Sequence, residues 1–291
     1  MYTMRPAEFD YRHPATLAEA VSMLTELEEA RPLAGGHSLL PMMKLRLSTP
    51  EALVDLGGIA GLDGIAEDDG GLRIGALATH ASVADSELVQ ARCPVLAETA
   101  ALIGDLQVRN RGTIGGSVAH ADPAADYPTL LKALGAVISA VGRDGEREIA
   151  VDEFFIDVFT TALQPGELVL SVRVPSTPTG TGAVYVKHRH PASSYAVVGV
   201  AAVVSVEEAA CTRAQLTIGG AVRTPVHATA AAEALLGVSG SEEEITDAAG
   251  RVAESLPDAL GDLYASAEYR VHLATVLAKR ACLAAFERAS S

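Results

Sequence analysis

The sequence lacks the residue clusters on which metal centres and hydrolases depend. Its three cysteines, Cys93, Cys211 and Cys282, stand far apart and form no C-x-x-C pair, whereas an iron–sulfur cluster is usually held by four thiolates. No H-E-x-x-H motif and no G-x-S-x-G elbow occur. We therefore expect buried free thiols, no metal ion held by this chain and no hydrolase activity.

Basic residues and long apolar runs are scarce as well. Lys and Arg number 22 against 37 Asp and Glu, which gives a formal net charge of −15. A surface of that sign repels nucleic acid and anionic membranes. No uncharged apolar run reaches the roughly 18 residues of a membrane-spanning helix, and Met1 to Asp10 has no basic and apolar signal pattern. These absences predict a cytoplasmic protein that binds neither nucleic acid nor membrane.

The residues that are present predict three consecutive units. Hydrophobic residues make up 49% of the 291 positions, enough for two or three cores. We place the units at 1–57, 58–175 and 180–291, because residues 175–182 are rich in Pro, Thr and Gly and are typical of a linker. Periodicity predicts helices over 16–30, 79–88, 95–103, 124–134, 226–236, 242–254 and 269–288. It predicts strands over 52–56, 72–77, 136–141, 167–174, 183–189, 196–206 and 212–218.

Two glycine turns are the strongest candidates for a ligand site. They are Ala34-Gly35-Gly36-His37-Ser38 and Thr113-Ile114-Gly115-Gly116-Ser117. Paired glycines permit positive φ and a close backbone approach, and successive N–H groups in such turns bind anions. Two of these turns can grip the two phosphates of a dinucleotide. The alternative is a plain turn at each position, and neither segment fits the Rossmann or P-loop pattern.

Four blocks in the same order resemble the flavoprotein (medium) subunits of molybdenum hydroxylases, a family that includes carbon monoxide dehydrogenase and xanthine dehydrogenase relatives. The blocks are FDYRHPATLAEAV from Phe9, AGGHSLLPMMKLRL from Ala34, LRIGALAT from Leu72 and RGTIGGSVAHADPAADYP from Arg111. The resemblance implies an α+β fold: a two-part α/β FAD-binding region (PCMH/VAO-like) and then a C-terminal α+β domain with an antiparallel sheet and helices.

The resemblance also implies roles for single residues in binding FAD, and no catalytic residue. The first loop contributes Ala34, Gly35, Gly36, His37, Ser38 and Leu39, and the second contributes Thr113, Gly115, Gly116 and Ser117. His120 takes a place close to the flavin, Ile103 one near the adenine, Asp126 one at ribityl or ribose hydroxyls, and Lys187 one near the pyrimidine edge. The alternatives are a core side chain for Ile103, a helix N-terminal charge for Asp126 and a solvated strand lysine for Lys187.

As a whole, the resemblance implies an electron-transfer subunit with non-covalent FAD. The molybdenum cofactor is then carried by a large molybdopterin subunit and the [2Fe–2S] clusters by a small subunit, in a dimer of heterotrimers. The flavin reduces an external acceptor such as NAD, oxygen or a quinone. Covalent attachment through His37 is a rival, as in some related flavoproteins. Two further rivals are an autonomous flavin oxidoreductase and a flavin-free assembly factor with the same fold.

Overall fold

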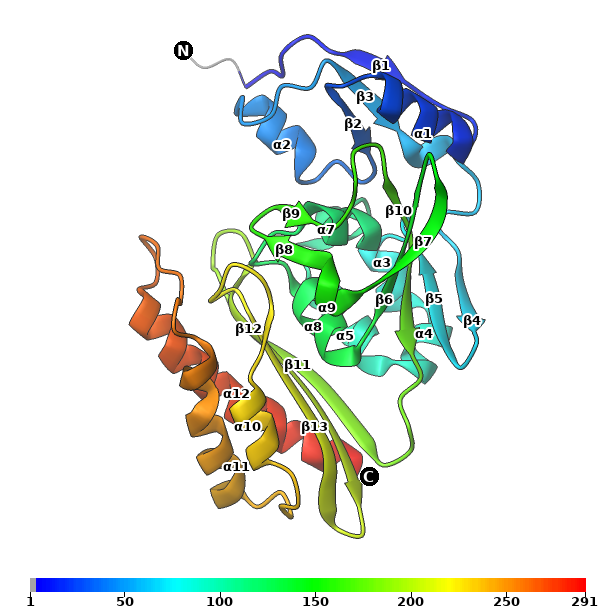
Figure 1. The fold of residues 1–291 in the computed structure, drawn as a ribbon. Helices are drawn as coiled ribbons and strands as arrows, with labels where there is room; N and C mark the ends of the chain where they lie inside the picture. The colour runs from blue at the N-terminus through cyan, green and yellow to red at the C-terminus, as the bar shows by residue number, and fades with distance from the viewer. Residues whose placement is uncertain (1–3) are drawn as a thin grey trace.

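A computed structural model describes residues 4–291; residues 1–3, with which the first expected unit begins, lie outside the described part. Three large sheets follow one another along the chain, each accompanied by helices (Figure 1). This architecture confirms the expected fold class, two α/β parts followed by an α+β part on an antiparallel sheet. No helix within residues 4–291 is both long and apolar enough to cross a membrane.

The first sheet is parallel, with strand order β1-β3-β2, and its edge strand β2 leads into the first glycine turn. Its helix begins where expected, because the Thr16 hydroxyl accepts a hydrogen bond from the Glu19 N–H. It ends at Glu26, short of the expected Ala30, because Ala30–Leu33 pairs with the neighbouring strand instead. The elements are β1 (Asp10–Arg12), α1 (Leu17–Glu26), β2 (Ala30–Leu33), α2 (Leu39–Lys44), β3 (Ala52–Asp55) and η1 (Leu56–Gly58).

The second sheet is antiparallel, with strand order β4-β5-β10-β6-β7. Its strands are β4 (Ile65–Asp68), β5 (Gly71–Gly75), β6 (Val137–Gly142), β7 (Gly145–Ala150) and β10 (Leu168–Pro175), and β8 (Phe155–Asp157) pairs separately with β9 (Thr160–Thr161). The helices are α3 (His80–Asp85), α4 (Glu87–Arg92), α5 (Pro94–Leu102), α6 (Leu106–Arg109), α7 (Ile114–His120), α8 (Asp126–Leu134) and α9 (Val151–Phe154). Buried side chains such as Leu72, Ile74, Leu96 and Tyr127 form their shared core.

Two expectations in this unit need correction. The single helix expected over 79–88 is divided, because the Ser86 hydroxyl accepts a hydrogen bond from the Val89 N–H and starts a new helix there. The second glycine segment is not a free turn. Thr113 caps α7, and Gly115 and Gly116 lie in the first turn of that helix.

The third sheet is antiparallel and carries the long C-terminal helix. The expected helix over 226–236 is wrong at its start, because residues 226–227 pair with β13 and the helix begins only at Thr229. The elements are β11 (Thr181–Arg189), β12 (Ala196–Glu207), β13 (Ala210–Gly219), β14 (Val226–His227), α10 (Thr229–Ala234), α11 (Glu242–Gly250), η2 (Arg251–Ser255) and α12 (Ala267–Ala289).

Strand β12 joins the last two units, because its alternating side chains enter two different cores. Ala201 and Val203 pack with the second sheet and its helices, whereas Val200 and Ala202 pack with α12. Side chains of a strand alternate between its faces, so burial on both faces explains the nearly continuous apolar run expected as a buried strand. This shared strand fixes the C-terminal sheet beside α8.

Candidate functional site

The first glycine turn presents unused backbone donors. Between β2 and α2 the chain turns at Gly36, whose φ is +75°, a conformation that favours glycine. Within residues 4–291, the five successive N–H groups of residues 35–39 make no hydrogen bond to a protein acceptor. The His37 ring is held by a 3.0 Å contact between its Nδ1 and the Gly35 oxygen. A run of free amide donors in a turn suits an anionic ligand.

The second glycine segment contributes in a different way, because its amides are already paired. Ile114 and Gly115 donate to the carbonyl oxygens of Ala78 and Ala76, and Gly116 donates to the Thr113 hydroxyl at 3.1 Å. Its glycines have negative φ and serve close packing instead. A Cβ on Gly115 would lie 2.4 Å from the Cβ of Ala76. We expected backbone freedom here, and the structure shows a steric requirement.

The two segments lie against each other. A Cβ on Gly35 would meet the Arg111 oxygen at 2.1 Å and the Gly112 Cα at 2.8 Å. A Cβ on Gly116 would lie 3.7 Å from that of Ala34. Residues separated by about eighty positions therefore form one backbone-walled site, and side chains larger than glycine at position 35 would push the walls apart.

His120, the last residue of α7, lies beside an exposed aromatic ring. Its ring centroid is 5.0 Å from that of Phe159, whose backbone is attached through a hydrogen bond from the Phe159 N–H to the Ala121 oxygen. Burial lowers the pKa of His120, and Asp122 opposes that shift. A neutral imidazole is therefore the form available at this end of α7.

Asp126 and Lys187 pair with each other. The Asp126 carboxylate accepts from Lys187 Nζ at 2.8 Å and from the Tyr185 hydroxyl at 2.7 Å. The two charged side chains are only 5% and 3% exposed. Burial raises the pKa of Asp126, while Lys187 and Tyr185 act in the opposite direction. The solvated strand lysine is thus excluded, and contacts of either residue with FAD stay predictions.

Ile103 lies just after α5, half-buried and packed against the second core. Its carbonyl oxygen accepts a hydrogen bond from Arg109 at 3.1 Å, and the same guanidinium donates to the Gly104 oxygen. The core packing that we considered as an alternative is present, and a contact with adenine stays a prediction.

Sequence reasoning missed Tyr195, which lies in the loop between β11 and β12. Burial raises the pKa of its phenol, and the nearby Ser38 side chain of the first glycine turn opposes this. Tyr195 is 40% exposed, so part of this residue stays open to solvent. The only sequence signal was an aromatic residue in the polar loop that follows Lys187.

His80 was also missed, and it is hydrogen-bonded to the residue before the second glycine segment. Its backbone N–H donates to the Gly112 oxygen at 2.9 Å, whereas its buried ring Nδ1 has no partner within residues 4–291. Burial lowers its pKa from 6.5 to about 4, with contributions from His37 and Arg109. The folded protein therefore keeps this ring neutral.

Because its pKa is lowered in the folded protein, His80 makes the protein less stable at acidic pH. The unfolded chain takes up the proton near 6.5 and the folded chain only near 4, so stability is lost as the pH falls through that window. We expect wild type to lose about 3 kcal/mol more than His80→Gln across it. Urea denaturation at stepped pH measures this difference, and equal slopes in the two proteins would contradict the burial of a neutral ring.

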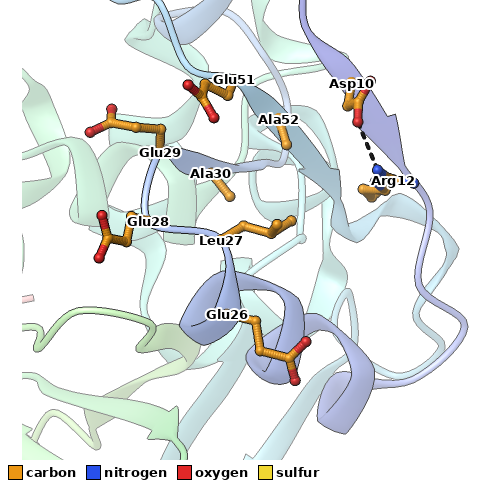
Figure 2. Close-up of a pocket in the computed structure, with 9 residues that line it drawn as sticks. All are labelled: Asp10, Arg12, Glu26, Leu27, Glu28, Glu29, Ala30, Glu51 and Ala52. Atoms are coloured by element: carbon orange, nitrogen blue, oxygen red, sulfur yellow. Dashed lines mark hydrogen bonds and ion pairs between the residues drawn. The ribbon is translucent and has the colours of Figure 1, made fainter.

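Two hollows lie away from the glycine segments. One, of about 380 Å³, is lined by carboxylates that include Glu28, Glu29 and Glu51 around β2 and β3 (Figure 2). Such a lining repels phosphate. Another lies between α1 and residues 141–143. The proposal of a ligand site at the glycine segments therefore rests on their backbone N–H donors and not on a cavity.

The thiols are buried and unpaired, as expected. Burial raises the pKa of Cys93 to about 11 and that of Cys282 to about 12, which keeps both protonated. Within residues 4–291 no group of three or more His, Cys, Asp or Glu side chains is arranged to hold a metal ion.

Comparison with known proteins covers nearly the whole chain. Residues 7–177 match the FAD binding domain in molybdopterin dehydrogenase, and residues 183–285 match the CO dehydrogenase flavoprotein C-terminal domain. The chain is 39% identical to the carbon monoxide dehydrogenase medium chain of Afipia carboxidovorans, over 99% of this chain and 100% of that one. It is 36% identical to the 6-hydroxypseudooxynicotine dehydrogenase complex subunit alpha of Paenarthrobacter nicotinovorans, over 98% and 97%. The solved structure of quinoline 2-oxidoreductase from Pseudomonas putida 86 matches at a TM-score of 0.94 and 32% identity, over 99% of this chain and 100% of that chain.

Proposed function

This chain belongs to the family of FAD-binding medium subunits of molybdenum hydroxylases, and we propose that it holds FAD non-covalently between residues 34–39 and 113–117. It is thereby an oxidoreductase subunit. The observation that carries the proposed site is the contact between the two glycine segments, one of which offers five unpaired amide donors. Bound FAD supplies the ability to accept electrons from one redox group and deliver them to another.

The residues around the pyrophosphate site define the rest of the proposal. Thr113 caps α7, Ser117 follows the two glycines in that helix, and His120 stands in its neutral form at the far end of α7. Tyr195, from the C-terminal unit, is proposed to border the site near Ser38. These groups bind and orient the cofactor, and none of them is arranged as an acid or base for an organic substrate. Ile103 and Asp126 complete the set proposed from the family pattern, whereas Lys187 is paired with Asp126.

We place substrate oxidation on a partner subunit. Relatives of similar identity to this chain are named for carbon monoxide, 6-hydroxypseudooxynicotine and quinoline. The similarity of this subunit therefore does not distinguish between substrates. We propose a large molybdopterin subunit and a small [2Fe–2S] subunit as partners, a dimer of heterotrimers, and NAD, oxygen or a quinone as the final acceptor. The buried, unpaired thiols favour a reducing compartment, the cytoplasm.

Co-purification tests the subunit role. A tag on this chain in its native host should recover two further polypeptides together with molybdenum, iron and FAD in fixed ratios. Because this chain holds no metal-ligand cluster within residues 4–291, the metals should leave with the partners when the complex is dissociated. Recovery of the chain alone, able to oxidise an organic donor, would instead favour an autonomous flavin oxidoreductase.

Acid precipitation tests the non-covalent link. We expect essentially all yellow colour to stay in the supernatant, because His37 belongs to the turn that we propose to bind the phosphates of FAD, where its Nδ1 contacts the Gly35 oxygen. Colour retained in the washed pellet would show covalent flavin and would overturn this part of the proposal.

A further inference from the structure

We infer that Lys187 is a positioning residue: its buried ion pair with Asp126 holds the loop 190–195, and with it Tyr195, against the first glycine turn. The inference rests on the proposed function, because that loop borders the proposed flavin site. It assigns Lys187 an indirect role in place of the direct flavin contact expected from the sequence.

The Lys187 ammonium group joins three parts of the chain. It projects from β11 and donates to Asp126 Oδ2 on α8 and to the Ser194 carbonyl oxygen, both at 2.8 Å. Tyr185, two residues earlier on the strand, donates to the other carboxylate oxygen. Two of the three donors of the ammonium group are thus committed to protein acceptors. Removing the ammonium group would leave the Asp126 carboxylate and the Ser194 carbonyl oxygen buried without this donor, and each loss is unfavourable.

The loop that Lys187 contacts is closed and strained. Ser194 donates to the His190 oxygen at 2.9 Å, and His190 donates to the Tyr195 oxygen at 2.8 Å. Ser194 has a φ of +65°, a left-handed conformation that residues other than glycine seldom keep without support. The bond from Lys187 to the Ser194 oxygen provides that support immediately before the aromatic residue.

The far side of the loop carries Tyr195 to the site. Its phenol is near enough to Ser38 of the first glycine turn for that side chain to oppose the rise in the phenol pKa that burial causes. The following residue, Ala196, donates its N–H to the Ala124 oxygen at 3.0 Å, in the segment that leads into α8. Both ends of the loop are therefore tied to the region around Asp126, so the ion pair sets how closely the ring approaches the turn.

Hydrogen exchange in the flavin-free chain tests the positioning role without a cofactor. The double variant Asp126→Asn/Lys187→Met removes both charges and nearly preserves volume. We expect the Ser194 and Ala196 amides to exchange about tenfold faster or more than in wild type, while β13 amides are unchanged. Unchanged exchange at both amides would overturn the inference. If the double variant does not fold, Lys187→Gln, which keeps one donor, is measured with the same criterion.

Arg288 provides a matched control. It too joins a carboxylate of the FAD-binding part, Glu98, to a β11 carbonyl oxygen, that of Ala183, both at 2.9 Å. Arg288→Met therefore cuts another link between the same two units, one that does not include the loop. We expect it to leave exchange at Ser194 and Ala196 as in wild type; equal acceleration would show a general loosening and count against Lys187.

A double-mutant cycle separates action through the loop from direct contact. With Tyr195 present, Lys187→Gln should raise the FAD dissociation constant about tenfold, and in the Tyr195→Ala variant it should have no further effect. Additive effects would show that Lys187 acts on FAD directly and would overturn the inference. If wild type itself binds no FAD, the proposed function fails, and the exchange experiment still decides the positioning role.

Discussion

Gly35→Ala should raise the FAD dissociation constant about 30-fold. The added Cβ would lie 2.1 Å from the Arg111 oxygen, a backbone atom that cannot swing away, so the two glycine segments must separate. Overpacking of this kind costs about 2 kcal/mol, and each 1.4 kcal/mol changes a binding constant tenfold. Fluorescence titration of FAD into the purified chain measures the change.

Gly64→Ala is the matched control. A Cβ at Gly64 meets nothing within 4 Å, and Gly64 is not among the glycines with positive φ. Its dissociation constant should stay within about twofold of wild type. If Gly35→Ala folds and binds FAD as wild type does, the two segments do not both border the cofactor and the proposed site is wrong.

Lys187→Met should destabilise the folded chain by about 3–5 kcal/mol at neutral pH. The substitution leaves Asp126 buried without its cation, which is the costly way to break a buried pair. Guanidinium denaturation of the wild-type and variant chains measures the difference. Arg288→Met, in an exposed pair, should cost no more than about 1 kcal/mol.

The pH dependence of this effect has a definite sign. Burial already raises the pKa of Asp126 in the folded protein, and loss of Lys187 raises it further. A carboxyl with a raised folded pKa favours folding below its unfolded pKa, and this contribution is lost as the pH rises through the folded pKa. The defect of Lys187→Met should therefore be largest at neutral pH and shrink as the pH falls toward about 4, the ordinary aspartate value. A defect that does not depend on pH would mean that Asp126 is not the group left uncompensated.

Local patterns predicted most elements because their causes are local. Thr16 and Glu19 determine the start of α1, and the nearly continuous apolar run along 196–206 reflects burial of β12 on both faces. The failures occurred where a distant partner decides. Ala30–Leu33 became a strand because β3 lies beside it, and residues 226–227 did so because β13 does.

The two segments of the site could be predicted from the sequence, but the contacts that require glycine in them could not. Both glycine pairs were found, yet only Gly36 has positive φ, whereas Gly35 and Gly115 are required by backbone from elsewhere in the chain. No pattern within one segment reveals such a contact. Tyr195 and His80 were missed for the same cause, since their partners Ser38 and Gly112 lie in other parts of the sequence.

An absorption titration with FAD tests the central claim most directly. We predict that the purified chain, alone or with its partner subunits, takes up one FAD with shifted flavin bands, and that Gly35→Ala weakens this uptake while Gly64→Ala does not. A folded wild-type chain that leaves FAD free in solution, both alone and within the assembled complex, would contradict the account.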